Sequence, residues 1–476
     1  MADSSLPPGA PRAPRLTDRL ARGFAVVYLC GLLAIVVAFK AAFVEIISVD
    51  PLFGVYGIVV CTFIVSRFVF SIAYRPSRDH GLEPRVAIVM PAFNEEAAIA
   101  DSLRSLLALD YPADKLQIVA VNDGSTDDTL RRMQAVAAQA GGRVEVIDLG
   151  RNRGKRAAMA AGIRATDADI ISFVDSDSVL EPDAMRILVQ GFHDPRVGAI
   201  CGHADVLNLH DTWLTKMQAV RYFVAFKVSK AAESVFGCVT CCSGCFSAYR
   251  REAILPHLAW WEDQRFLGVE STFGDDRSLT NCVLRTWKVR YESRAISHTI
   301  VPDSFRTFMT QQVRWKRSWT RESLILGSFM WRKHTIAALA AYVGMILPLI
   351  APIVAVRAVL WSPIAGGATP LVYLAGVYAM AVAYGLYYTA RQPRYCGIWI
   401  YGVVFCFFYL VFLLWQTYYA IFTARTAAWG TRPATAGMEP EPASAPANVV
   451  ALNPAARASS PPPQRAAVLA GGIDAS

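Results

Sequence analysis

The sequence predicts an α/β domain with a Rossmann-like parallel sheet, carried on a platform of transmembrane α-helices. The chain has 476 residues, of which 54% are hydrophobic, and soluble domains average roughly 45–50%. The apolar residues are concentrated at residues 24–72 and 335–423. Between these regions, residues 81–317 alternate short β-rich runs with segments of helical periodicity. This alternation is typical of a sheet covered by helices.

The arginines that flank the first apolar region predict its orientation. Residues 24–74 contain two apolar stretches, each long enough to cross a bilayer core of about 30 Å as a helix. Arg22 precedes the first stretch and Arg75 follows the second, which places both ends in the cytosol by the positive-inside rule. We therefore expect a multi-pass protein of the plasma (inner) membrane, with a cytosolic N-terminal segment at 1–23 and a cytosolic domain at 81–317.

The C-terminal part is expected to return to the membrane. Residues 318–334 are amphipathic and are predicted to lie on the membrane surface. Residues 335–424 contain two further spans and then a long apolar stretch at 395–423. If that stretch crosses once, residues 425–432 lie outside; if it re-enters, they lie in the cytosol, and we favour re-entry. The Ala- and Pro-rich tail, 433–476, is predicted to be disordered.

Several functional classes are disfavoured by composition and motif. The net charge is +9, but it comes largely from residues near the membrane boundaries. The soluble part carries no basic stripe with interleaved aromatic residues, so no nucleic-acid partner is predicted. It also lacks a complete P-loop and a Gly-x-Gly-x-x-Gly motif after the first strand, which argues against an ATPase or a dehydrogenase.

The expected strands and helices place a site at one edge of the sheet. Ligands of such sheets bind beyond the carboxyl ends of the parallel strands. The motifs described next follow those ends. The expected strands are residues 85–90, 116–121, 144–148 and 170–174, and the expected helices are residues 95–109, 127–140 and 155–165.

Acidic and basic residues gather at this edge. Asp175 and Asp177 directly follow an apolar strand, and two such carboxylates can hold a hard divalent cation beside a diphosphate. Taken alone, this pattern is usually a surface turn. Here Asp123 ends an earlier strand, and Lys155 and Arg156 open a helix, where cations and backbone amides suit phosphate or uracil oxygens.

Two further elements add reactive groups. Asp275 and Asp276 are adjacent acids, which are usually a solvated turn, but in this setting one of them can act as a general base. Arg314 can neutralise a leaving diphosphate. Trp315 can stack on a sugar ring, although an Arg-Trp pair before a membrane is more often an interfacial anchor.

In combination these elements resemble the processive, membrane-bound family-2 glycosyltransferases, which include cellulose, chitin and hyaluronan synthases. The fold implied by the resemblance is GT-A-like. The details are similar to the bacterial hyaluronan synthases over about residues 54–432. The segments that carry this similarity are residues 54–57, 242–244, 247–252, 264–268, 274–281, 311–315 with 318 and 321–323, and 429–432.

The resemblance implies a role for each motif residue. Asp177 would bind Mg²⁺ or Mn²⁺, and Asp276, with Asp275 beside it, would be the catalytic base. The residues that would hold the UDP part of the donor or close over its diphosphate are Asp123, Lys155, Asp175, Arg314, Trp429 and Arg432. Those expected near the acceptor are Trp315, Gln311, Cys242, Ser243 and Gly244.

The predicted function is synthesis of hyaluronan from UDP-GlcNAc and UDP-GlcA, with export of the polymer across the lipid bilayer. The alternative is a single-donor synthase of chitin or poly-N-acetylglucosamine. Cys245-Phe246 departs from the Pro-Leu of the family pattern near the expected acceptor, whereas Asp275-Asp276 favours hyaluronan over chitin-type relatives. A transporter would leave the acidic and basic motifs unexplained. Zinc is disfavoured because the four thiols of residues 238–245 leave no loop between pairs.

Overall fold

A computed structural model gives the fold of this protein. It describes residues 50–365, 369–392 and 397–426, together with Val27, Cys30, Gly31 and Ala34. The expected N-terminal segment, most of the first span and the expected disordered tail lie outside the described residues, as do Trp429 and Arg432.

The soluble domain is built on an eight-stranded sheet of order β3-β2-β1-β4-β7-β6-β10-β5. Its first four strands are parallel to one another. Strand β7 runs antiparallel to both of its neighbours, and β5 runs antiparallel to β10. The strands are β1 (Val86–Ala92), β2 (Leu116–Asn122), β3 (Val144–Asp148), β4 (Ile170–Phe173), β5 (Ser178–Leu180), β6 (Val197–Val206), β7 (Ser247–Arg250) and β10 (Lys288–Thr299).

Alternate residues of the central strands feed two apolar cores. Val89 and Val119 belong to the core on one face, and Ile88 and Ile118 to the core on the other, because successive side chains of a strand point to opposite faces. The first core is closed by α5 (Lys155–Arg164), α9 (Arg251–Ile254), α10 (Leu258–Glu262) and α11 (Asp275–Leu284). The second is closed by α3 (Ile99–Leu107), α4 (Thr129–Gln139) and α6 (Ala184–Val189).

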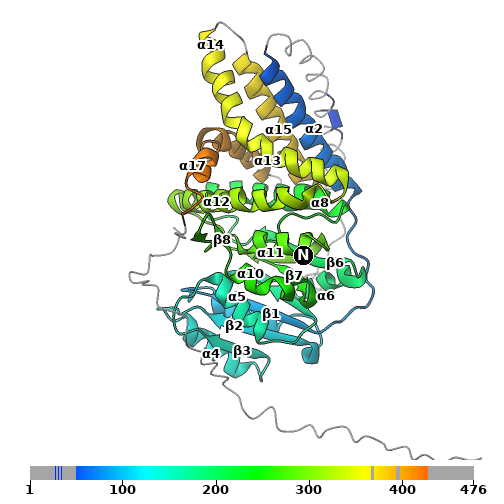
Figure 1. Cartoon of the computed structure of the whole chain (residues 1–476), viewed down its shortest axis with the longest axis vertical. Coiled ribbons are helices and arrows are strands. Elements are labelled where there is room, and N and C mark those ends of the chain that lie inside the picture. Colours follow the sequence, from blue (N-terminus) through cyan, green and yellow to red (C-terminus); the bar gives the residue numbers. More distant parts are fainter. Residues whose placement is uncertain are drawn as a thin grey trace, which may run out of the picture.

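A layer of helices separates the sheet domain from the apolar helices. Helix α12 (Phe305–Met330) and α8 (Ala231–Val235) lie crosswise above the domain (Figure 1). In the chain, α7 (Trp213–Phe223) and a π-helix (Val224–Lys230) lead into α8. Residues 318–330 of the amphipathic segment expected at 318–334 form the second half of α12, which begins inside the segment expected to belong to the domain. The helix is continuous across residue 317.

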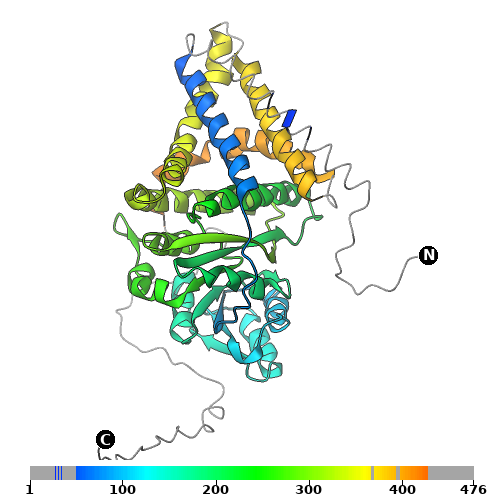
Figure 2. The same ribbon diagram turned by 90° about the vertical axis from the view of Figure 1, so that its right-hand side faces the viewer.

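The apolar helices stand on this layer (Figures 1 and 2). Among the described residues, three helices are long and apolar enough to cross a membrane: α2 (Pro51–Ala73), the helix Thr335–Ile364 that begins with α13 (Thr335–Val356), and α15 (Thr369–Arg391). A fourth candidate is a helix pair bent by 44°, Gly397–Leu413 and Gln416–Phe422, which contains α16 (Ile400–Phe408) and α17 (Gln416–Phe422). The bend lies within residues 395–423, the stretch for which the sequence allows either a single crossing or a re-entry.

The first four predicted strands are present within about two residues of their expected bounds, and the GT-A-like fold on apolar helices is confirmed. The sheet as a whole is mixed, because β7 inserts antiparallel between β4 and β6. Strand β7 has only four residues, and three of them are fully buried. It therefore lacks the alternation of buried and exposed residues by which a strand is predicted from sequence.

Candidate active site

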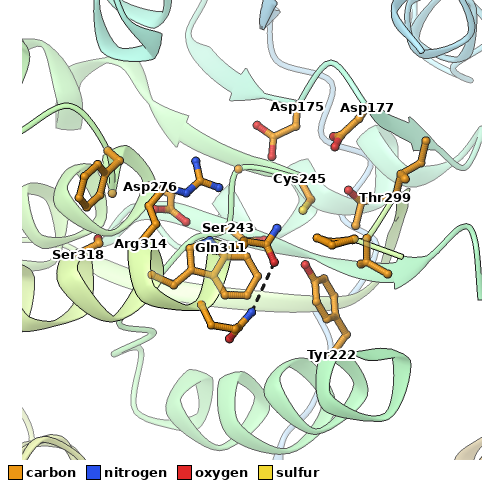
Figure 3. Close-up of a pocket in the computed structure, with 18 of the residues that line it drawn as sticks. Asp175, Asp177, Tyr222, Ser243, Cys245, Asp276, Thr299, Gln311, Arg314 and Ser318 are labelled. Carbon is orange, nitrogen blue, oxygen red and sulfur yellow. Dashed lines mark hydrogen bonds between the residues drawn. The ribbon is translucent and has the colours of Figure 1, made fainter. Parts of the chain in front are cut away.

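A cavity of about 1080 Å³ opens at the carboxyl ends of β1, β2 and β4. Helix α12 and helix α7 contribute its walls on the side of the apolar helices. Figure 3 shows side chains from these separate elements pointing into it, with Asp175 and Asp177 on one side and Gln311 and Arg314 on another. This edge of the sheet is the place where ligands of such folds bind.

Asp123 shapes the first part of the rim. It directly follows β2 and is 2% exposed. Its carboxylate accepts hydrogen bonds from the backbone amides of Arg153, at 2.7 Å, and Gly154, at 3.0 Å. These amides precede the first turn of α5, so Asp123 holds the loop that presents Lys155 to the cavity.

Lys155 and Asp175 form a partly buried ion pair in the cavity wall. The Lys155 Nζ lies 2.5 Å from Asp175 Oδ1. Burial alone would lower the pKa of Lys155, but the carboxylates of Asp175 and Asp275 outweigh it and raise that pKa well above its usual value. Lys155 is therefore a fixed positive charge at neutral pH. Gly244 makes room for the pair, because a Cβ there would lie 2.9 Å from both carboxylate oxygens of Asp175.

Asp177 lies near two other carboxylates of the cavity wall, those of Asp175 and Glu95. Burial, followed by the charges of Asp175 and Glu95, raises the pKa of Asp177 to about 7. All three side chains line the cavity. Like charges held this close favour either a bound proton or a bound cation, and oxygen ligands of this kind suit Mg²⁺ or Mn²⁺.

The adjacent acids Asp275 and Asp276 have different surroundings. The Asp275 carboxylate accepts a hydrogen bond from Arg156 Nε at 2.6 Å, and both side chains are about 95% buried. The same guanidinium donates to the carbonyl of Trp261, whose indole donates back to the carbonyl of Asp275. Arg156, expected to serve phosphate or uracil, is thus engaged beneath the cavity wall and is not among the residues that line the cavity.

Asp276 is half-buried and lines the cavity. Its carboxylate accepts a hydrogen bond from the backbone amide of Arg277 at 2.8 Å and a weak one from the Cys241 thiol at 3.5 Å. Neither contact is an ion pair. Of the two acids, only Asp276 has no cationic side chain bonded to it within the described structure.

Helix α12 carries the next group. Gln311, Arg314, Trp315 and Ser318 all line the cavity, and their spacing of three and four residues places them on one face of the helix. Gln311 accepts a long hydrogen bond from the neighbouring Gln312, at 3.5 Å. Trp315 presents its ring to the cavity beside the guanidinium of Arg221, which lies 5.2 Å from the ring centroid.

Helix α11, which carries Asp276, is joined to α12 by a buried polar network. Gln264 donates to Glu322 at 3.0 Å, and Ser278 donates to Gln264 at 2.8 Å. Asn281 also donates to Glu322, at 2.9 Å. Gly274 permits the close approach of the two helices, because a Cβ there would lie 2.0 Å from the Ser318 hydroxyl. The base candidate and the face of α12 are therefore held in register.

The loop before β7 supplies a further polar wall. Ser243 and Gly244 line the cavity, and the Ser243 hydroxyl is buried without a hydrogen-bond partner in the described structure, so it can accept a ligand hydroxyl. Cys242, expected near the acceptor, lies behind this wall, where its backbone amide donates to Thr280 at 2.9 Å. Its thiol is not part of the cavity lining.

A thiol–ammonium pair at the cavity wall, to which Lys230 belongs, was not predicted from the sequence. Lys230 Nζ lies 3.1 Å from the Cys201 sulfur. Burial alone would raise the pKa of Cys201, but a hydrogen bond from Cys242 and the charge of Lys230 outweigh it and lower that pKa to about 5. Arg221 was also missed. It stands in no motif, and it reaches the cavity through the packing of α7 against α16 and through its contact with Trp315 of α12.

Comparison with known proteins gives the family. The model of Glycosyl transferase family 2 matches residues 87–255. A hyaluronan synthase of Streptococcus pyogenes serotype M3 is 31% identical over 393 residues, covering 80% of this chain and 90% of the relative. An N-acetylglucosaminyltransferase of Azorhizobium caulinodans is 32% identical over 364 residues, covering 74% and 88%.

A solved structure agrees with the fold. The mannosyltransferase PcManGT from Pyrobaculum calidifontis, in complex with GDP-Man and Mn²⁺, superposes with a TM-score of 0.51 at 20% identity, covering 76% of this chain and 99% of its own. With a hyaluronan synthase matched at 31% identity over nine-tenths of its length, and with apolar helices above the domain, the chain is a membrane protein that belongs to the family-2 glycosyltransferases, in the hyaluronan synthase-like group.

Proposed function

We propose that this enzyme polymerises UDP-GlcNAc and UDP-GlcA into hyaluronan in a processive, inverting reaction and moves the polymer across the membrane. The observation that carries the proposal is the cavity itself. It brings Asp175, Asp177 and Asp276 together with the sugar-stacking face of α12, and it reaches residues of the apolar helices such as Pro348 and Phe405. The similarity to hyaluronan synthases over 80% of the chain supports the choice of product.

The donor side is assigned to the rim of the sheet. Lys155 and Arg314 supply positive charge for the donor diphosphate, and Asp123 fixes the loop that presents Lys155. Trp429 and Arg432 are proposed to close over the donor from the cytosol, on the premise that the bent helix pair re-enters. This assignment places the catalytic domain in the cytosol and the apolar helices in the plasma (inner) membrane.

Asp177, with Asp175, is proposed to hold Mg²⁺ or Mn²⁺. Within the described ranges no three His, Cys, Asp or Glu side chains form a metal cluster by themselves, so phosphate oxygens of the donor would complete the set. The two carboxylates fit this role, because burial and then the negative charges of Asp175 and Glu95 raise the pKa of Asp177, and the charge of Lys155 offsets them only in part. When bound, the metal would stabilise negative charge on the leaving diphosphate.

The acceptor side is assigned to α12 and the Ser243–Gly244 wall. Trp315 stacks on the terminal sugar of the growing chain, while Gln311 and the Ser243 hydroxyl bind its hydroxyl groups. Asp276 accepts the proton of the attacking hydroxyl. Asp275 is proposed to support the site through its buried ion pair with Arg156.

The proposal is tested by incubating purified protein with each UDP-sugar singly and with both together. We expect high-molecular-weight polymer only with both donors, and complete digestion of that polymer by hyaluronan lyase. The N-acetylglucosaminyltransferase relative and the Cys245-Phe246 departure favour the alternative, a single-donor synthase. Long polymer from UDP-GlcNAc alone, resistant to the lyase and cut by chitinase, would establish that alternative instead.

A further inference from the structure

Arg221 places an unused guanidinium group in the wall of the cavity. It comes from α7, lies beyond every sequence motif and lines the cavity together with Trp315. Its Cζ atom lies 5.2 Å from the centroid of the Trp315 ring and 5.8 Å from that of Phe405. These two aromatic contacts fix the plane of the guanidinium beside the proposed platform for the acceptor sugar.

No negative charge balances Arg221 in the described part of the chain. Its Nη1 atom is buried without a hydrogen-bond partner, and it takes part in none of the ion pairs between described residues. Tyr222 and Tyr409 interact with it electrostatically, and so does a second cation, Lys316. Burial and, next, the charge of Arg221 lower the pKa of Lys316 to about 7.

The two cations differ in their contacts. Lys316 donates to the carbonyl of Leu413 and to the hydroxyl of Thr417, at 3.2 Å for the latter, so its ammonium is held by the apolar helices. Among the described residues, the Arg221 guanidinium has the rings of Trp315 and Phe405 beside it and no hydrogen-bonded carboxylate. A buried charge without a partner is unfavourable, and a guanidinium matches a planar carboxylate with two parallel hydrogen bonds. Arg221 therefore has the properties of an anion-binding residue.

The position of Arg221 indicates which anion. The diphosphate and metal are proposed to lie beside Lys155, Asp175 and Asp177, whereas Arg221 lies beside the ring of Trp315. Resting on the proposed function, we infer that Arg221 binds the carboxylate of a glucuronyl unit in the acceptor chain. A polymer of N-acetylglucosamine alone offers no anionic group to this guanidinium, so Arg221 would make the acceptor site selective for a uronate-containing chain.

The test compares two ligands that differ only in charge. The probes are a hyaluronan octasaccharide and its carboxyl-reduced form, in which glucose replaces glucuronate. Binding to the purified full chain is followed by quenching of tryptophan fluorescence. For the wild type we expect the charged form to bind about 10- to 100-fold more tightly, the range for hydrogen bonds between charged groups.

In Arg221→Met this preference should vanish, and in Arg221→Lys it should shrink, because the charge remains but the paired hydrogen bonds do not. Lys216→Met is the matched control, since Lys216 is a cation of the same helix that does not line the cavity; it should keep the full preference. A wild type that binds both forms equally, or an Arg221→Met variant that still prefers the charged form, overturns the inference.

Failure of the proposed function is recognised separately. If the wild type makes a chitinase-sensitive polymer from UDP-GlcNAc alone, hyaluronan synthesis is excluded whatever the binding ratio. If it makes hyaluronan and Arg221→Met keeps the preference for the charged octasaccharide, the function stands and the role of Arg221 is wrong.

Discussion

The same substitution, Asp to Asn, should affect different properties at the neighbouring acids Asp275 and Asp276. At Asp275 it should lower the stability of the protein, and at Asp276 it should lower the rate of UDP release. Asp275→Asn removes the negative partner of Arg156, whose side chain is 6% exposed and whose Nε lies 2.6 Å from the carboxylate. Breaking a buried pair from one side costs about 3–5 kcal/mol. Since about 1 kcal/mol shifts the melting temperature of a domain of this size by roughly 2–4 °C, we expect a decrease of about 6–20 °C.

Asp276→Asn changes a half-buried carboxylate that has no ion-pair partner among the described side chains. Both acids lie in the first turn of α11, so any loss of favourable charge at the helix N-terminus, about 0.3–1 kcal/mol, is common to the two variants. We expect Asp276→Asn to melt within about 3 °C of the wild type and to lose at least about 100-fold in UDP release.

The assay is a thermal unfolding scan in detergent, paired with initial rates of UDP release. Arg156→Met together with Asp275→Leu provides a further check, because replacing a buried pair by apolar residues is often close to neutral; the double variant should melt above Asp275→Asn. The reasoning is refuted if both single variants melt alike, or if Asp276→Asn retains near-normal turnover.

Three further results are expected. Gly244→Ala should weaken donor binding at least tenfold, because its Cβ would press on two carboxylate oxygens at 2.9 Å, while Gly376→Ala, with open space around it, should not; calorimetry with UDP and Mn²⁺ measures this. The folded protein lowers the pKa of Cys201 from 9.0 to about 5. The Cys201 thiolate therefore stabilises the folded protein fully above pH 9, and this contribution is lost as the pH falls towards 5. Cys201→Ser should therefore flatten the melting temperature over that interval, and an unchanged profile would contradict the assignment. A tag at Ser476 should resist protease in intact cells, and cleavage there would place the C-terminus outside.

Much of the fold could be predicted because its signals are local. The two further spans expected within residues 335–424 correspond to the apolar helices α13 and α15. The first four strands follow apolar runs bounded by turns. Strand β7 could not be placed, because its partners β4 and β6 come from earlier segments and its burial leaves no alternating pattern.

The site was predictable where chemistry follows a strand end and not where it depends on distant partners. Asp175 and Asp177 follow β4, so their place on the rim follows from topology. The distinction between Asp275 and Asp276 depends on Arg156, a residue 119 positions away. Arg221 carries no sequence signal, because its proposed role depends on the nearby ring of Trp315 and on the lack of an ion-pair partner among the described residues.

The joint between α11 and α12 has a mechanical consequence. Helix α12 rests against the apolar helices, and the buried Gln264, Glu322 and Asn281 bind α11 to it without a hinge. Helix α11 is also packed into the sheet core and tied to α5 through the Arg156–Asp275 pair. The sheet rim, Asp276 and the ring of Trp315 should therefore move as one rigid body, so a change in lipid thickness should leave their mutual spacing unchanged.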